Sequence, residues 1–380
     1  MSELAARPVK SLRDHGADSF SQLIDRWFPT PQFLLPHACG IDISDASLKW
    51  LTLAPPQSNS PKVAAWGDVP LSPGIVAHGI VRDAHALAQV LQEIKPHLAA
   101  SAAHVALPEE AAYVFSMHVP RGSDRQQILS MIEFEFEGRV PIPPSAAVYD
   151  FSVIDGKEGT EGMEVGVTVF PSELATSYAA AFEEAGITLL SFEVEARSIA
   201  RAVSSCDEGE PITLLVDFGF ARTGFAVLKR GIPIFTSTVE VGGNAIMDAL
   251  MRALSLSPEE AEKFGDTHGL VATSGTAPSS GADAITGTAI LLSDEITRHY
   301  RYWDTRRNEH GERVTPVGKV VLVGGSANLN GLPEFIAGRV QAPVVRGNIW
   351  RHICRFDEYI PPIDYRMSLK FATAAGLALR

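Results

Sequence analysis

Two short stretches decide the fold of this sequence: Ile41–Ser47, which reads IDISDAS, and Val216–Thr223, which reads VDFGFART. In each, an apolar run typical of a strand ends in an aspartate, and a small residue two positions later begins a turn into a second strand. The strand–strand–strand–helix–strand order that starts near residue 38 recurs after residue 210. The sequence therefore predicts an α/β protein of two duplicated halves, each opening with the same kind of hairpin.

The residue types in these hairpins suit a phosphate clamp. Small turn residues let backbone N–H groups approach phosphate oxygens, and the hydroxyls of Ser44, Ser47 and Thr223 add donors. Asp42 and Asp217 would face a hydrated magnesium ion, which takes one or two carboxylates and keeps several waters. One such hairpin is ordinary turn chemistry. Two in matching positions of duplicated halves predict a shared phosphate and magnesium site.

Two Gly-Gly pairs also lie between an expected strand and a helix start. One is Gly242-Gly243, and the other is Gly324-Gly325, which is followed by Ser326. Glycines at such a place bring backbone N–H groups close to an anion. The alternative for each pair is a tight turn that only begins a helix, and the pattern leaves both interpretations open.

The composition is that of an ordinary globular protein. Of 380 residues, 46% are hydrophobic and 20% are charged, enough apolar material for two or three packed domains. The formal net charge of −13 disfavours nucleic acid and anionic lipid as general partners. Cys39, Cys206 and Cys354 lie far apart without a CxxC spacing, as in a reducing cytosol. No signal peptide and no apolar run of about 20 residues is evident, so we expect a soluble protein.

The chain divides into four predicted parts. The first 36 residues form an extension in which an apolar stripe predicts a short amphipathic helix: Phe20, Leu23, Ile24, Trp27 and Phe28. We expect this helix to pack on its own protein; a partner-binding or membrane-surface helix is the alternative, and the lack of a basic face disfavours the membrane. The other parts are a first subdomain at 37–108, 187–207 and 365–380, an inserted βαββα subdomain at 109–186, and a second lobe at 208–364.

The order of these motifs resembles the superfamily of actin, heat-shock chaperones and sugar kinases. Within it, the sequence is similar to the type IV pilus assembly protein PilM family. The matching segments are Gly40–Leu53, Phe134–Asp150 with EFEGRVPIPPSAAVYD, Phe235–Asn244 with FTSTVEVGGN, SPEEAEKFG at 257–265, the strand, Gly-Gly-Ser turn and helix at 320–344, and ATAAGLA at 372–378.

The resemblance implies an actin-like (ribonuclease H-like) duplicated two-lobe α/β fold, with an insert similar to that of the division protein FtsA. It implies a cytoplasmic protein that binds ATP and Mg²⁺ and belongs to a pilus or related secretion platform. Such a protein docks the cytoplasmic N-terminal tail of a PilN-like inner-membrane protein in a groove between the first subdomain and the insert, here residues 60–110 and 109–186. Other platform proteins are expected partners, membrane contact would be indirect, and a homo-oligomer is left open.

The resemblance and the hairpins together name the site residues. Asp42 and Asp217 would hold magnesium through water, and Glu195 matches a position that orients the attacking water, with a solvated charge at a helix start as the alternative. The expected nucleotide-binding set is Asp42, Ser44, Asp45, Ser47, Lys49, Asp217, Gly219, Arg222, Thr223, Gly242, Gly243, Glu262, Gly324, Gly325 and Ser326.

The sequence departs from the family pattern in ways that predict slow hydrolysis at most. Ser44 replaces the usual glycine of the first hairpin, Gly265 stands where a lysine reaches the ribose, and Phe220 and Arg222 are bulkier than usual. Arg222 would either supply charge to a phosphate or block the site. A nucleotide-free pseudo-ATPase scaffold therefore remains an alternative. A second is an FtsA-like division protein, which the missing terminal amphipathic helix disfavours. A third is a small-molecule kinase, for which no substrate-facing aspartate base is recognisable.

Overall fold

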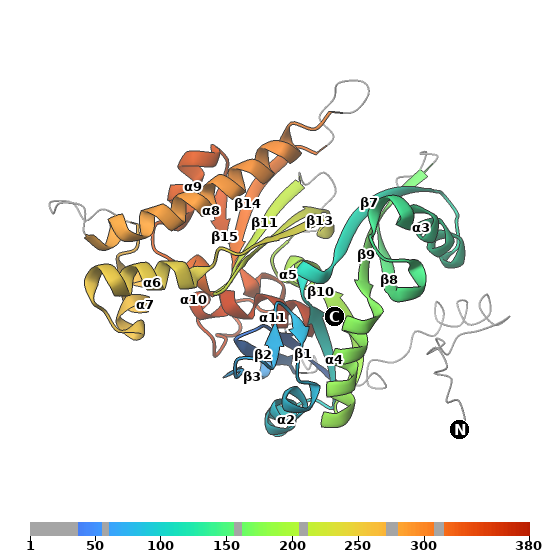
Figure 1. Ribbon diagram of the computed structural model, residues 1–380, viewed down its shortest axis with the longest axis horizontal. Helices are drawn as coiled ribbons and strands as arrows, with labels where there is room; N and C mark the ends of the chain where they lie inside the picture. Colours follow the sequence, from blue (N-terminus) through green and yellow to red (C-terminus); the bar gives the residue numbers. More distant parts are fainter. Residues whose placement is uncertain (1–36, 55–60, 156–161, 205–211, 271–279, 308–314) are drawn as a thin grey trace. The chain divides into compact units, whose positions relative to one another are not determined.

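The computed structural model describes residues 37–54, 61–155, 162–204, 212–270, 280–307 and 315–380 (Figure 1). The chain divides into two units, 1–37 and 38–380, and the fold below is that of the second. The helix expected at residues 20–28 lies outside the described residues. Of the helices that the structure describes, none has both the length and the apolar character needed to cross a bilayer.

The first lobe is built on a five-stranded sheet in the order β10-β6-β1-β2-β3. β1 and β2 form the antiparallel hairpin expected from IDISDAS, and β1 pairs with β6 in parallel. Their apolar residues are almost wholly buried, as in a sheet covered on both faces. The bounds are β1 Ala38–Ile43, β2 Ser47–Leu53, β3 Val63–Pro70, β6 Ala102–Leu107 and β10 Thr188–Val194, with a small β4 Val76–Ala77 and β5 Ile80–Val81 ladder.

The second lobe repeats this arrangement in the sheet β13-β12-β11-β14-β15. β11 and β12 form the second predicted hairpin, and β11 pairs with β14 in parallel, as β1 does with β6. The predicted duplication of the α/β fold is thereby confirmed. The bounds are β11 Ile212–Phe218, β12 Thr223–Lys229, β13 Ile232–Val239, β14 Val317–Val323 and β15 Val344–Arg346. The helices are α6 Gly243–Leu254, α7 Pro258–Thr267, α8 Ser280–Asp304, α9 Leu332–Val340 and α10 Tyr365–Ser368.

Two helices join the lobes, and one of them, α11, is made largely of small residues. α5 (Glu195–Val203) packs on α11 (Ala372–Ala378), and α11 also contacts β1 and β2. The approach of α11 to α5 is so close that a Cβ added at Gly376 would lie 1.7 Å from the Ser198 carbonyl oxygen. This contact explains the small residues of the ATAAGLA segment and places the starts of both helices beside the hairpins.

The insert is a small sheet with one helix against it (Figure 1), and it has a hydrophobic core of its own. Its strands β7 (Tyr113–Pro120), β9 (Gly162–Pro171) and β8 (Ala147–Asp155) form one antiparallel sheet in that order. α3 (Arg125–Arg139), which starts at a capping box, turns Ile128, Ile132 and Phe136 toward this sheet.

The last helix of the predicted insert packs elsewhere. α4 (Ser172–Ala185) buries Leu174, Tyr178 and Phe182 in the core of the first sheet, beside α2 (Ala84–Ile94). The apolar contacts therefore form a βαββ unit rather than the expected βαββα unit, because the apolar stripe of α4 faces the first lobe. The exact subdomain boundaries stay a prediction.

The insert is also tied to the second lobe. β7 lies beside β13, and Lys229 of β12 forms an ion pair with Glu164 of β9, whose side chain is 9% exposed. Arg230, in the turn between β12 and β13, donates from Nη1 to the Ile154 carbonyl oxygen at 3.3 Å. One edge of the second sheet is thus in direct contact with the insert.

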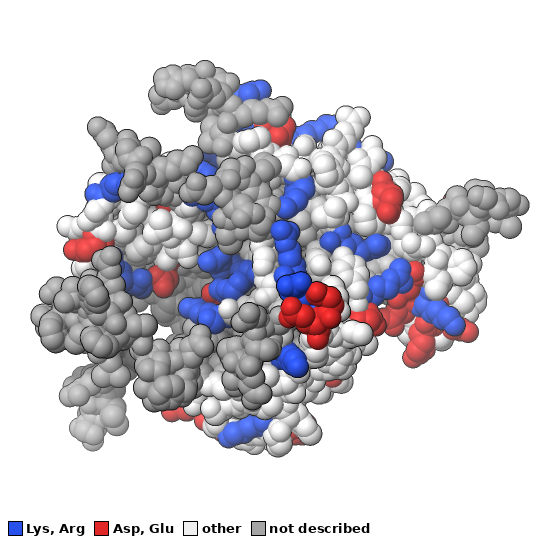
Figure 2. Space-filling model, turned by 180° about the vertical axis from the view of Figure 1, so that it is seen from behind, with Lys and Arg blue, Asp and Glu red and all other residues white. Residues whose placement is uncertain are grey.

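The net negative charge does not produce a uniformly acidic surface. Figure 2 shows one face of the molecule, on which basic side chains gather near the middle next to a compact acidic group. Salt screens exposed charges over a distance of roughly 10 Å, so a partner at this face meets the local charges rather than the total charge of the protein. The total charge of −13 is therefore weaker evidence against anionic partners at this face than it is for the protein as a whole.

Candidate functional site

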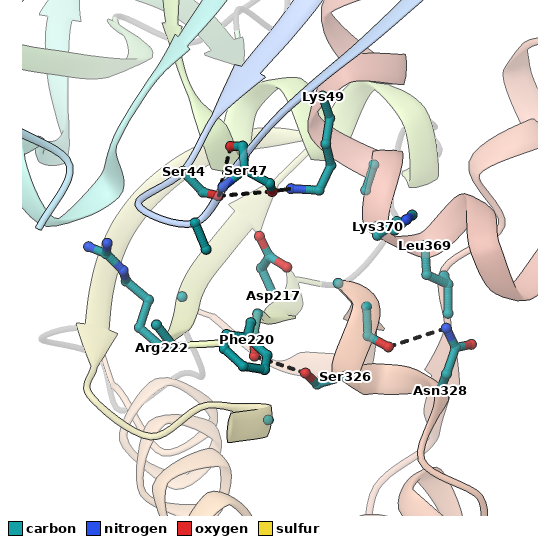
Figure 3. A pocket seen from close by; sticks show the side chains of 18 of the residues that line it. Ser44, Ser47, Lys49, Asp217, Phe220, Arg222, Ser326, Asn328, Leu369 and Lys370 are labelled. Atoms are coloured by element: carbon teal, nitrogen blue, oxygen red, sulfur yellow. Dashed lines mark hydrogen bonds between the residues drawn. The ribbon is translucent and has the colours of Figure 1, made fainter. Parts of the chain in front are cut away.

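The two hairpins line one cavity of about 830 Å³ between the lobes (Figure 3). A cavity of this size falls within the usual range for cofactor sites. The turn after β1, the turn after β11 and the Gly-Gly-Ser turn after β14 all contribute to its wall. Of the residues predicted from sequence, the following line it: Asp42, Ser44, Asp45, Ser47, Lys49, Glu195, Asp217, Gly219, Arg222, Gly243, Glu262, Gly324, Gly325 and Ser326.

The first hairpin closes its turn with its own side chains. The Ser44 hydroxyl donates to the Ser47 carbonyl oxygen at 3.0 Å and accepts the Ser47 N–H at 3.2 Å. Ser44 is not among the described residues with a positive φ, so serine makes this turn without backbone strain. Lys49 Nζ donates to Ser47 Oγ at 2.8 Å and lies 3.9 Å from Asp42 Oδ2. The hairpin thus presents a lysine and an aspartate side by side.

The second hairpin is held by distant parts of the chain. The Gly219 carbonyl oxygen accepts the Gly243 N–H at 3.0 Å and the Ser326 hydroxyl at 3.0 Å (Figure 3). The Phe220 carbonyl oxygen accepts the Asn244 N–H at 2.8 Å. The backbone N–H groups at the start of α6 therefore donate to the second hairpin. Of the two interpretations left open for Gly242-Gly243, these contacts favour the tight turn that begins a helix, because the N–H groups of Gly243 and Asn244 already have carbonyl partners.

Two predicted residues do not line the cavity. Thr223 is fully buried, and its hydroxyl donates to the Val241 carbonyl oxygen at 2.5 Å. Gly242 packs against the backbone of the second hairpin, where a Cβ would lie 2.2 Å from the Phe220 carbonyl oxygen. Both residues shape the turn and are not placed to touch a ligand in the cavity.

The Gly-Gly-Ser turn requires glycine at its first position. Gly324 has φ +88°, and a Cβ there would lie 2.5 Å from Asp217 Oδ1 and from the Phe218 carbonyl oxygen. The close approach of β14 to β11 at this point fixes the Asp217 carboxyl against the cavity wall. At Gly325, the next residue, an added Cβ would meet only Lys370 Cβ, at 3.6 Å.

Four carboxyl groups meet at the floor of the cavity: Asp42 and Glu109 are buried, and Asp217 and Glu195 are half-buried. Burial raises the pKa of Asp217 to about 6, and the neighbouring Asp42 adds to the rise. Burial also raises the pKa of Asp42, while Lys49 opposes the change. The pKa values of Glu109 and Glu195 lie well above the ordinary range, because both carboxyls are shielded from water beside the other acids. A cation placed here would relieve this repulsion.

The carboxyls do not form a ready-made metal cage. Within the described ranges, no group of three or more His, Cys, Asp or Glu side chains is arranged to hold a metal ion directly. A hydrated Mg²⁺ needs only one or two carboxylates, so Asp42 and Asp217 fit such an ion through water. Glu109 was missed from sequence because an isolated glutamate before a strand gives no local signal.

The far end of the cavity is apolar and suits a nucleoside. α6 contributes Ile246, Met247 and Leu250, and α7 contributes Glu262 and Gly265. A Cβ at Gly265 would meet only Leu329 Cδ1 at 3.5 Å, so the glycine leaves open space where the family pattern has a lysine. Further lining residues that the sequence did not indicate are Glu110, Asp266, Asn328, Arg366, Met367, Lys370 and Thr373.

Arg222 neither fills the cavity nor stays free. Its guanidinium forms ion pairs with Asp45 of the first hairpin and with Glu110, which precedes the insert. Figure 3 shows its side chain at one side of the cavity, away from Lys370. The sequence left open whether Arg222 binds phosphate or blocks the site. In this structure its guanidinium is engaged in ion pairs instead, and they connect the two walls that carry Asp45 and Glu110.

Comparison with known proteins defines the class first. Duplicated sheets around a nucleotide-sized cavity are the architecture of actin-like proteins. MreB5 of Spiroplasma citri, solved with bound ADP, matches with a TM-score of 0.51 and 12% identity over 90% of this chain and 95% of that one. The ethanolamine utilization protein EutJ from Carboxydothermus hydrogenoformans matches with a TM-score of 0.50 and 18% identity over 94% of each chain.

The particular family follows from the sequence. The model of the family "Type IV pilus assembly protein PilM" matches residues 40–380, so the chain belongs to this family. The solved structure of a PilM-PilN type IV pilus biogenesis complex matches with a TM-score of 0.72 and 22% identity, over 90% of this chain and 98% of that one. The predicted family is confirmed. No curated protein sequence matches the chain significantly.

Proposed function

We propose that this PilM-family protein binds ATP with Mg²⁺ between its two hairpins and uses the bound state to recruit a membrane partner. The observation that carries the nucleotide site is the meeting of Asp42 and Asp217, one from each half, in one buried cavity with Lys49. The proposal is supported by the PilM family membership and by the fold shared with an ADP-bound actin-like protein.

Each wall of the cavity has a task in this proposal. Lys49 neutralises phosphate charge at the first hairpin, and Asp42 and Asp217 hold the hydrated magnesium, which shields the phosphates from the carboxyls. Glu195, half-buried at the start of α5, holds a proton or orients water at the same floor. The apolar residues of α6 cover the nucleoside.

The partner we propose is the cytoplasmic N-terminal tail of a PilN-like inner-membrane protein. The support is the fold shared with the solved PilM-PilN complex. The tail would dock between the first subdomain and the insert, so that the protein is cytoplasmic and peripheral to the inner membrane through its partner. In this role the protein is a scaffold of the type IV pilus or a related secretion platform.

Calorimetry with Mg-ATP tests the nucleotide site. We expect wild type to bind, Asp217→Ala to lose binding, and Asp283→Ala to behave as wild type, because Asp283 is exposed on α8 and does not line the cavity. A second titration, with a synthetic peptide of the PilN-like tail, tests docking. Folded wild type that binds neither ligand would refute the proposal, and binding of the peptide alone would reduce the protein to a nucleotide-free scaffold.

A further inference from the structure

The chain enters the insert through the wall of the nucleotide cavity. The short helix η3 (Glu109–Ala111) lines the cavity with both of its glutamates, and β7 begins two residues later at Tyr113. Neither glutamate belongs to the proposed nucleotide-binding set. β7, the first strand of the insert, therefore follows directly on η3, which a ligand in the cavity would contact.

Glu109 is packed into the wall of the cavity beside β12 and α5. A Cβ added at Gly224 of β12 would lie 2.5 Å from Glu109 Oε2, and burial together with the neighbouring acids, Glu109 among them, raises the pKa of Glu195 at the start of α5. Glu109 is 6% exposed, so this contact is shielded from water. This end of η3 is a fixed point beside the magnesium-facing carboxyls.

Glu110 forms an ion pair with the guanidinium of Arg222, which also pairs with Asp45 of the first hairpin. Arg222, at the tip of the second hairpin, pairs with both Glu110 and Asp45, and the three side chains are 22%, 22% and 26% exposed. Asp45 is anchored further, because it accepts the backbone N–H groups of His78 at 3.0 Å and Gly79 at 2.9 Å. Glu110 is thus the partner of Arg222 that connects directly to the insert.

From this arrangement we infer that Arg222 and Glu110 couple the phosphate end of the cavity to the insert. The terminal phosphate of a bound nucleoside triphosphate competes with Glu110 for the Arg222 guanidinium, which prefers planar, bidentate oxyanion partners. A partly exposed ion pair is weak enough to exchange in this way. Release of Glu110 loosens the start of β7, while Glu109 and the Lys229–Glu164 pair keep the insert attached elsewhere.

The consequence is a protein whose insert responds to the number of phosphates in the cavity. A diphosphate leaves Arg222 on Glu110, and a triphosphate draws it away, so docking of a partner on the insert differs between the two. This inference rests on the proposed function, because it requires both a nucleotide in the cavity and a partner at the insert. Glu110 acts through Arg222 and is a positioning residue.

The test compares the affinity for the PilN-like tail peptide in ADP and in a non-hydrolysable ATP analogue, each with Mg²⁺. We expect wild type to show a difference of at least about fivefold, the lower end of measured allosteric couplings. Glu110→Gln should bind both nucleotides yet give the same peptide affinity in each. Glu137→Gln, which removes one exposed charge from α3, is the matched control and should keep the difference.

Hydrogen exchange of residues 113–120 gives a readout that does not depend on the peptide. Exchange there should differ between the two nucleotides in wild type and not in Glu110→Gln. If that variant fails to fold, Arg222→Lys replaces it, because lysine keeps the charge but cannot span both carboxylates; we expect a smaller difference.

Two results overturn the inference and leave the proposed function standing. One is wild type that binds both nucleotides and the peptide with no difference between ADP and the analogue. The other is Glu110→Gln or Arg222→Lys that retains the full difference. Wild type that binds no nucleotide defeats the proposed function and the inference together.

Discussion

The first and second hairpins have the same strand pairing, but different hydrogen bonds stabilise their turns. The first closes through Ser44 and Ser47, which are neighbours in sequence, whereas the second is held by the starts of α6 and η5 (Gly325–Asn328). The duplication has kept the strand pairing and the aspartate, while the chemistry that closes each turn has changed. A substitution at Ser44 should therefore act locally, because Asp45 is the residue that ties the first hairpin to distant segments. A substitution at the supports of the second hairpin should disturb the whole site.

The largest effect is expected at the support of the second hairpin. Gly324→Ala puts a Cβ 2.5 Å from Asp217 Oδ1 on a residue with φ +88°. Strain at a left-handed position and overpacking each cost on the order of 1–3 kcal/mol, so we expect a combined loss of about 4 kcal/mol in the free energy of unfolding. Urea denaturation measures it, and Mg-ATP binding should fall with it.

The neighbouring glycine supplies the control. Gly325→Ala meets nothing closer than 3.6 Å and has no positive φ, so its unfolding free energy should change by less than about 1 kcal/mol. Equal losses for the two variants would contradict the claim that the approach of β14 to β11 fixes the second hairpin.

A middle-sized effect of opposite sign is expected at Asp217. Its pKa of about 6 in the folded protein exceeds the ordinary value of 3.8, so the folded state holds the proton more tightly than the unfolded chain. The ionised carboxyl therefore destabilises the protein increasingly as pH rises from about 4 to 6, by up to ~3 kcal/mol above that range. Asp217→Asn should stabilise the ligand-free protein at pH 7.5.

The pH dependence separates this cause from packing. Thermal unfolding of wild type and Asp217→Asn should differ most above pH 6 and converge near pH 3, where the aspartate is largely protonated in both folded and unfolded states. A stabilisation that is the same at both pH values would show that the amide packs better and that the buried charge is not the cause.

The smallest effect is expected in the first hairpin. Ser44→Gly introduces the residue that the resemblance implies at this position and removes the three hydrogen bonds of the Ser44 hydroxyl, while the Ser44 N–H to Ser47 carbonyl bond of 2.9 Å does not need the side chain. We expect a loss of about 1 kcal/mol in stability, partly from the greater freedom of glycine in the unfolded chain. Calorimetry should find Mg-ATP affinity close to that of wild type; a large loss would mean that the hydroxyl itself touches phosphate.

The fold was predictable because its signals are local. Apolar runs ending in Asp42 and Asp217, turn residues after them and a Gly-Gly pair after a buried strand each mark an element within a few residues. The same locality explains why most of the expected cavity residues do line it, since strand ends of a duplicated fold face one another.

The sequence predicts least well where contacts between segments far apart in the chain determine the role of a residue. The N–H groups of Gly243 and Asn244 looked available in sequence, and only the folded chain shows that the second hairpin accepts them. α4 was assigned to the insert by its order; its apolar stripe packs on the first sheet, and the bounds of the subdomains stay a prediction. Glu109 and Glu110 gave no signal because an acid matters only when it is buried beside other charges, which sequence alone does not show.

The central claim is that one carboxylate from each hairpin completes a single nucleotide site. Calorimetric titration of Mg-ATP into wild type, Asp42→Asn and Asp217→Asn tests it most directly, since each variant changes one half of the duplication. We predict binding by wild type and loss of at least tenfold in affinity, about 1.4 kcal/mol, in both variants. Loss in one variant only, or wild-type affinity in both, would contradict a site shared by the two hairpins.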